Sequence, residues 1–181
     1  MDAVVRRFFL FTVVGVVISG ERVRVFAVGD GVVGVNGEVW SLGPFPDNAP
    51  PYPGHALLRG GPAEAPGFEV LREMAVGEVE SIVVATDGAS EWGDVQGRFL
   101  PGTEERVGAL AQVWEEDRYF AHPDALWRKL ARMNRARVLP AWESRVLRRE
   151  PGLLEDDTTL VVIRKKRCGG ESAGAEYRRA G

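Results

Sequence analysis

Apolar and polar residues alternate with the period of β-strands in several short stretches of the first half of the chain. The apolar run Phe8 to Ile18 is rich in strand-forming Val, Ile, Phe and Thr, and Arg22 to Phe26 alternates strictly. The polar break Ser19-Gly20-Glu21 between them predicts a β-hairpin. A basic pair before an apolar run is also typical of a signal peptide, but the acid at position 2 and the lack of an Ala-x-Ala pattern favour the hairpin.

Two more pairs of strands are predicted up to residue 85. Val32 to Val35 and Glu38 to Leu42 flank Asn36-Gly37, which is the dipeptide most typical of a two-residue hairpin turn. Phe68 to Met74 and Glu80 to Ala85 form the next predicted pair, with a short turn between them.

The rest of the chain alternates irregular and helical patterns. Seven of the eleven prolines lie in residues 43–66, which predicts an irregular excursion from the sheet. Apolar residues at helical spacing predict helices over Thr103 to Glu116 and Pro123 to Arg137, and a short third one over Pro140 to Arg149. Thr158 to Ile163 predicts the last strand. The chain is therefore expected to be an α+β protein with antiparallel β-sheets flanked by helices, in a domain over residues 8–164 followed by a basic polar tail, 165–181.

Composition narrows the chemistry. A chain of 181 residues that is 45% hydrophobic and 27% charged has the size and apolar content of a folded domain. Its 23 Lys and Arg against 26 Asp and Glu argue against a nucleic-acid partner. The single cysteine excludes an internal disulfide. The two histidines are too few for a His-rich zinc site and argue against a serine triad. Any chemistry is expected to depend on carboxylates, in a cytoplasmic protein without a membrane partner.

Aspartates stand where the predicted strands begin and end. Asp30 follows the strand that ends near Val28, Asp87 follows the strand that ends at Thr86, and Asp156 and Asp157 precede the last strand. In an antiparallel sheet the end of one strand lies beside the start of its neighbour, so these acids are expected at one sheet edge. Grouped carboxylates repel each other unless a hard cation such as Mg²⁺ or Mn²⁺ lies between them. Aspartates also follow strands simply because Asp-Gly forms turns, which is the simpler explanation for each one alone.

Three segments around these aspartates resemble, in order, motifs of the metal-dependent type 2C protein serine/threonine phosphatases. The segment Val83 to Glu91 reads strand-Thr-Asp-Gly-Ala-Ser-Glu, and Asp156 to Val162 reads Asp-Asp-Thr-Thr followed by an apolar strand. Phe26 to Gly31 resembles the central Gly-Asp element of the family. Each motif is short, but their order and their places on the predicted elements make the combination specific. The resemblance covers roughly residues 8–164.

The resemblance implies an α-β-β-α sandwich and a metal-dependent hydrolase. Asp87 and Asp156 would be ligands of a dinuclear Mn²⁺ or Mg²⁺ centre, and Asp30 and Glu91 would lie near a further, weaker metal position. In this family the two metals activate a water that attacks the phosphorus of phosphoserine or phosphothreonine in a protein substrate. No nucleophilic side chain is needed, in agreement with the few His and Cys residues.

The chain also departs from the family pattern. The family begins with an acidic residue on an early strand and an Asp-Gly-x-Gly motif whose Asp bridges both metals, whereas residues 1–7 contain only Asp2 as an acid. By resemblance the domain is thus N-terminally incomplete, and residues 1–181 are expected to bind Mn²⁺ weakly and to hydrolyse an aryl phosphate slowly or not at all. Two functions stay open: a protein phosphatase, and a non-catalytic phosphatase-like binding or regulatory module.

One other motif has a weaker claim. Gly29 to Gly34 matches the G-x-G-x-x-G pattern of dinucleotide-binding sites. Such a site needs a helix to begin there, because the helix N-terminus binds the pyrophosphate. The Asn-Gly turn that follows predicts a hairpin instead.

Overall fold

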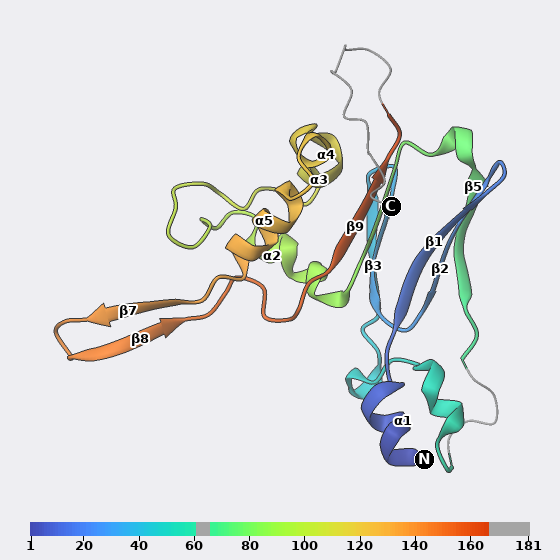
Figure 1. The fold of residues 1–181 in the computed structure, drawn as a ribbon, viewed down its shortest axis with the longest axis horizontal. Helices are drawn as coiled ribbons and strands as arrows, with labels where there is room; N and C mark the ends of the chain where they lie inside the picture. Colours follow the sequence, from blue (N-terminus) through green and yellow to red (C-terminus); the bar gives the residue numbers. More distant parts are fainter. Residues whose placement is uncertain (61–65, 167–181) are drawn as a thin grey trace, which may run out of the picture.

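The structure is a computed structural model that describes residues 1–60 and 66–166. Two antiparallel sheets form its centre (Figure 1). The first sheet has the order β1-β2-β5, with β1 Val13–Ser19, β2 Arg22–Val28 and β5 Glu69–Ala75. The second has the order β4-β3-β6-β9, with β3 Gly31–Val35, β4 Glu38–Leu42, β6 Ser81–Ala85 and β9 Leu160–Arg164. The mixed α and β composition and the antiparallel sheets agree with the fold class expected from the sequence.

Helices and a separate hairpin complete the described chain. The helices are α1 Asp2–Phe8, α2 Trp92–Val95, α3 Gln112–Glu115, α4 Arg118–Ala121 and α5 Ala125–Met133. Single 3₁₀ turns lie at Pro46–Asn48, Pro53–Leu57, Val76–Glu78 and Asp87–Glu91. The hairpin consists of β7 Arg137–Ala141 and β8 Val146–Glu150 and projects away from the sheets (Figure 1). No helix in the described ranges is long and apolar enough to cross a lipid bilayer.

The two sheets pack face to face, and helices cover the other face of the second sheet. Val23 and Val25 of β2 are buried in one cluster with Val33 of β3 and Ile82 of β6. The neighbouring Val83 belongs to a second cluster, because successive strand residues point to opposite faces. That second cluster also holds buried residues of the helical side: Trp92, Val95, Leu100, Val107, Val113, Trp114, Met133, Leu153 and Leu154.

Several expectations from the sequence need correction. The strands at 69–75 and 81–85 were expected to pair with each other, but β5 pairs with β2, and β6 pairs with β3 and β9. The chain crosses from the first sheet to the second at the turn Val76–Glu78, which joins β5 to β6. The start of the first strand was also placed too early, since α1 ends at Phe8 and β1 begins only at Val13.

Two predicted helices are wrong. Over 103–116 only α3 is helical, because Gly108 has a φ of +76° and the Thr103 hydroxyl accepts the N–H of Glu105 in a local turn. Over 140–149 the chain forms the β7–β8 hairpin, in which residues on each strand alternate between the two faces. The helix expected from Pro123 is confirmed as α5, with narrower bounds. The basic tail lies outside the described residues from position 167 on.

Candidate functional site

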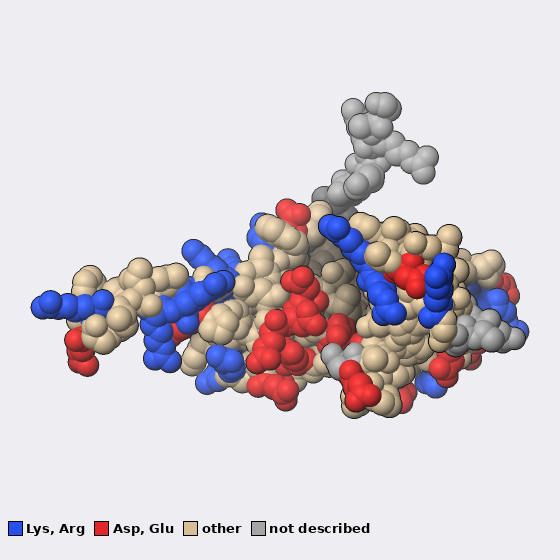
Figure 2. All heavy atoms as spheres, turned by 90° about the horizontal axis from the view of Figure 1, so that it is seen from below, with Lys and Arg blue, Asp and Glu red and all other residues tan. Residues whose placement is uncertain are grey.

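Four acidic side chains line one cavity of about 250 Å³ at an end of the second sheet. They come from three separate segments of the chain: Asp30, Asp87 with Glu91, and Asp156. Figure 2 shows a gathering of acidic side chains on this face of the molecule. The structure therefore brings together all four residues that the sequence singled out.

Asp30 lies where the chain crosses from the first sheet to the second. β2 ends at Val28 and β3 begins at Gly31, so the crossing takes only two residues. Gly31 has a φ of +148°, and a Cβ there would lie 2.5 Å from Cγ2 of Val14 and 2.8 Å from the carbonyl oxygen of Ala85. Only glycine fits such a crossing, and the crossing fixes Asp30 at the rim of the cavity.

Asp87 is positioned by the residue before it. Thr86 and Thr159 bond to each other twice: the N–H of Thr86 donates to the Thr159 carbonyl at 3.0 Å, and the N–H of Thr159 donates to Oγ1 of Thr86 at 3.0 Å. The Thr86 hydroxyl also donates to the carbonyl of Asp157 at 3.1 Å. These bonds join the end of β6 to the start of β9, which brings Asp87 and Asp156 to the same cavity.

Gly88 allows the two loops to approach closely. A Cβ at this position would lie 2.7 Å from Oγ1 of Thr158, and 3.0 and 3.1 Å from the carbonyl oxygens of Asp156 and Asp157. Any side chain would therefore push the 156–158 loop away. The Thr158 hydroxyl in turn donates to the Asp156 carbonyl at 3.1 Å, which stabilises the loop locally.

The carboxylates themselves have mostly backbone partners. Oδ1 of Asp156 accepts the N–H of Asp157 at 2.7 Å, and Oδ1 of Asp87 accepts the N–H of Gly88 at 3.1 Å. Oε2 of Glu91 accepts the N–H of Glu155 at 2.7 Å. In each case one carboxylate oxygen carries the bond, and among the described residues the other oxygen accepts no side-chain donor, so it can serve as a ligand.

The charges in the cavity act on one another. Burial raises the pKa of the Asp87 carboxyl above its ordinary value, and the charges of Asp30 and Asp156 raise it further. Burial, together with the charges of Asp30 and Asp87, also raises the pKa of the Tyr52 phenol. The site thus holds an excess of negative charge that a bound cation would relieve.

The donor set suits Mg²⁺ or Mn²⁺ chemically, but the acids do not form a complete cage. Carboxylate oxygens are the ligands that these hard cations take. Among residues 1–60 and 66–166, however, no three His, Cys, Asp or Glu side chains are placed to hold one ion. The four acids can line one cavity without being close enough to coordinate one ion, so the shared cavity and the lack of a three-residue metal group are compatible. Mg²⁺ would have to be held here by one or two carboxylates and complete its shell with water or phosphate oxygens.

Several residues at the site were not predicted from the sequence. The segment from Ser41 to Phe45, at the end of β4 and just beyond it, also lines the cavity, as does Ser90 beside Glu91. Tyr52 comes from the proline-rich excursion, where its ring stacks edge-on to His55 with the centroids 5.0 Å apart. That excursion lacks periodicity, and its only signal was the presence of polar and aromatic residues among prolines.

The two remaining sequence candidates have other roles. Asp157 does not line the cavity and instead contributes its carbonyl to Thr86. The G-x-G-x-x-G segment leads into β3 and the β3–β4 hairpin, so its glycines do not precede a helix.

Comparisons of the chain with protein-family models, with curated proteins and with solved structures find no match.

Proposed function

We propose that this chain is a metal-dependent protein phosphatase of the type 2C kind, which hydrolyses phosphoserine and phosphothreonine by means of Mn²⁺ or Mg²⁺. One observation carries the proposal: Asp30, Asp87 and Asp156, from three separate segments, line one cavity and repel one another there. The resemblance of the three surrounding motifs supports the same reaction. Hydrolysis of a phosphate ester by a metal-activated water uses an oxygen-rich, cation-binding cavity and no nucleophilic side chain.

The roles of the residues follow from their positions. Asp87 and Asp156 would hold the principal metals, and Asp30 and Glu91 would stand at a further metal position. When bound, the metals supply an activated water and neutralise the phosphoryl oxygens. The chain's own residues orient the site: Thr86 joins the end of β6 to the loop before β9, which brings Asp87 and Asp156 together, and Glu91 fixes the backbone at Glu155.

A non-catalytic phosphatase-like binding module is the second candidate. What favours it is that no three metal-ligating side chains of the described chain surround one point. A site with one or two protein ligands per ion binds metal weakly, and hydrolysis with two metals requires both to be present. In this alternative the cavity recognises a phosphorylated residue without cleaving it.

The test is metal binding and turnover by residues 1–181. Mn²⁺ binding is measured by electron paramagnetic resonance, and release of p-nitrophenol from p-nitrophenyl phosphate is measured with saturating Mn²⁺ and with chelator. Asp87→Asn and Asp156→Asn are compared with Asp94→Asn, an exposed aspartate on α2 outside the cavity. We expect weak Mn²⁺ binding and slow Mn²⁺-dependent hydrolysis, both lost in the two cavity variants and kept in the control.

The other outcomes separate the candidates. Mn²⁺ binding that depends on Asp87, without any turnover of aryl phosphate or phosphothreonine peptide, would assign the chain to the binding-module alternative. Hydrolysis that survives in both cavity variants, or Mn²⁺ binding unaffected by them, would contradict the proposed site.

A further inference from the structure

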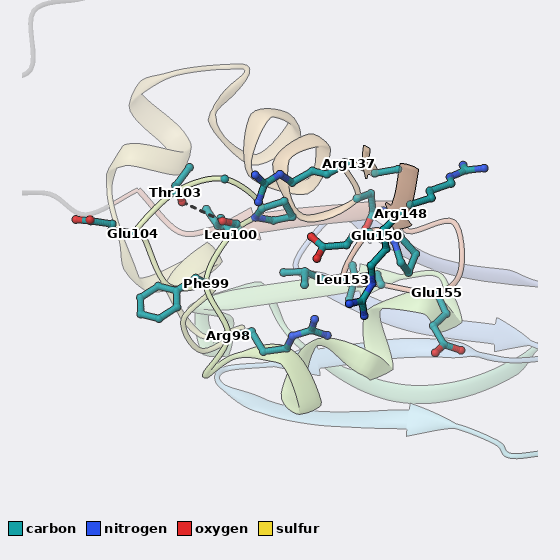
Figure 3. Close-up of a pocket in the computed structure, with 18 residues that line it drawn as sticks. Arg98, Phe99, Leu100, Thr103, Glu104, Arg137, Arg148, Glu150, Leu153 and Glu155 are labelled. Carbon is teal, nitrogen blue, oxygen red and sulfur yellow. Dashed lines mark hydrogen bonds between the residues drawn. The ribbon is translucent and has the colours of Figure 1, made fainter. Parts of the chain in front are cut away.

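A second, larger cavity lies at the base of the β7–β8 hairpin, and four arginines and three glutamates contribute the charged groups of its lining. It has a volume of about 1050 Å³ and lies between the turn 98–104 and the hairpin (Figure 3). Buried Leu153 and Leu154 contribute to its apolar lining. The arginines that line it are Arg98, Arg137, Arg148 and Arg149. An adjoining depression of about 620 Å³ shares Arg137 and adds Arg132 and Arg135.

These arginines differ from those that form ion pairs elsewhere in the described chain. Arg22, Arg24 and Arg164 each form an ion pair with an acid at 3.0 Å or less. Within the described residues, neither an ion pair nor a side-chain hydrogen bond involves the four arginines of the cavity. Glu104, Glu150 and Glu155 also line it, but none lies within 4.0 Å of their guanidinium nitrogens. Arginines that converge without partners repel each other and have their donor groups free for an anion.

The positions of three of the arginines fit an anionic ligand. Arg98 follows α2 and Arg148 lies on β8, and the two come from opposite sides of the cavity (Figure 3). Arg137 lies over the turn 100–104, where a Cβ on Gly102 would be 3.7 Å from its Cζ. Planar guanidinium groups held in this way bind carboxylates or phosphates with two parallel hydrogen bonds.

The hairpin beside the cavity favours a protein ligand over a nucleic acid. Trp142 and Leu147 at its end are 82% and 75% exposed, and Val146 is exposed as well. A two-stranded hairpin with an apolar, exposed end is the kind of surface that a polypeptide partner covers.

The arginine cavity and the acidic cavity share one stretch of chain. Leu153, Leu154 and Glu155 line the arginine cavity, and the next residue, Asp156, lines the acidic cavity. The bond from the N–H of Glu155 to Glu91 fixes this boundary. A peptide that lies along the boundary would present different residues to the two cavities.

We propose that the arginine-lined cavity binds an acidic segment of the phosphoprotein substrate, near the phosphorylated residue in its sequence. This inference rests on the proposed function for the identity of the partner, whereas the binding of an acidic peptide rests on the cavity alone. The preferred substrates would therefore carry acidic residues a few positions from the phosphoserine or phosphothreonine.

The test measures binding and turnover separately in the full chain. A fluorescein-labelled phosphothreonine peptide with a flanking run of Glu is compared by fluorescence anisotropy with the same peptide carrying Gln, in the presence of chelator. The variant Arg98→Gln/Arg148→Gln is compared with Arg59→Gln/Arg128→Gln, which removes the same charge from exposed positions outside both cavities. Melting temperatures check that both variants fold.

We expect the cavity variant to bind the Glu peptide at least about tenfold more weakly, because two charge-assisted donors are lost, and the control to change less than about twofold. The Gln peptide should bind weakly to all three proteins. Rates on p-nitrophenyl phosphate should be the same in all three. Equal losses in the two variants, or equal binding of the two peptides, would overturn the inference. A single-stranded RNA that displaces the Glu peptide at lower concentration than unlabelled peptide would assign the cavity to nucleic acid.

The two proposals fail in different ways. If none of the proteins hydrolyses p-nitrophenyl phosphate but the Glu peptide still depends on Arg98 and Arg148, the acidic-segment site stands and the phosphatase proposal fails. If hydrolysis depends on Asp87 but the arginine variant binds the Glu peptide normally, only the acidic-segment site fails.

Discussion

The backbone N–H of Glu155 donates a hydrogen bond of 2.7 Å to Oε2 of Glu91, across 64 positions of the chain. Glu91 ends the turn after β6, and Glu155 stands in the loop before β9. The bond therefore holds together the two loops that carry Asp87 and Asp156, and it lies between the acidic and the arginine-lined cavities. Its strength comes from the charge of the acceptor.

Glu91→Ala should lower stability and loosen the site. Loss of one charge-assisted bond to the backbone should reduce the free energy of unfolding by about 1 kcal/mol, which corresponds to a melting temperature about 2–4 °C lower. Glu91→Gln keeps an oxygen acceptor, so its loss in free energy of unfolding should be less than half of the loss in Glu91→Ala. Thermal unfolding followed by circular dichroism, in chelator, checks the order. A larger loss for Gln than for Ala would contradict the assigned bond.

Met133→Ala should be far more damaging than the truncation of an exposed residue on the same helix. Met133 on α5 is 0% exposed and belongs to the cluster between the helices and the second sheet, whereas Trp127 on the same helix is 69% exposed. Truncation of a buried methionine costs about 2–5 kcal/mol. Trp127→Ala should change the free energy of unfolding by less than about 0.5 kcal/mol. Urea unfolding of both variants measures the difference in the free energy of unfolding. Similar losses would mean that α5 packs against the second sheet with a different face.

The strands were predictable because their signals are local. Period-two alternation in β2 and the Asn36-Gly37 turn specify these elements without help from the rest of the fold. The pairing of β5 and β6 was not predictable in this way. Strands that follow each other usually pair, but here Asn36 accepts the N–H groups of Glu80 and Ser81 and so fastens the start of β6 to the β3–β4 turn.

The site was predictable to the extent that it depends on strand ends. Asp30 and Asp87 stand within two residues of a strand of the second sheet and Asp156 lies in the loop that leads into β9, so their meeting followed from antiparallel pairing. Tyr52 and the segment 41–45 reach the site through tertiary packing of an aperiodic stretch, which leaves no periodic signal. The arginine cavity depends on the β7–β8 hairpin, and the sequence pattern had predicted a helix there.

Gly88→Ala should disrupt the site without removing a charged group. The added Cβ would lie 2.7 Å from Oγ1 of Thr158 and 3.0 Å from the Asp156 carbonyl, so the loop must move. Such crowding typically costs about 1–3 kcal/mol, and Mn²⁺ affinity should fall with it. Gly93→Ala is the matched control, because a Cβ there meets nothing within 4 Å and α2 tolerates alanine well. Unchanged stability and Mn²⁺ affinity in Gly88→Ala would show that the two loops need not lie so close.

Asp87→Asn should make the metal-free protein more stable at neutral pH. Burial and the charges of Asp30 and Asp156 raise the pKa of the Asp87 carboxyl, so the folded state disfavours its charged form. For a raised carboxyl pKa, stability falls as pH rises through the window between the unfolded and folded pKa values, and the penalty is complete above the folded value. Asparagine removes this penalty. Because the group is largely exposed to water, the gain should be only about 0.5 kcal/mol.

The pH and metal dependence of that gain test its cause. The difference in melting temperature between Asp87→Asn and the wild type should be positive at pH 7 in chelator and should shrink toward zero as the pH falls below the ordinary aspartate pKa, where both states carry the proton. Mn²⁺ or Mg²⁺ should raise the melting temperature of the wild type and not that of the variant, because an ion that binds only the folded state stabilises it. Asp94→Asn, exposed on α2, should show neither effect. A variant less stable than the wild type at pH 7 in chelator would mean that Asp87 is held by favourable contacts rather than by strain that a cation relieves.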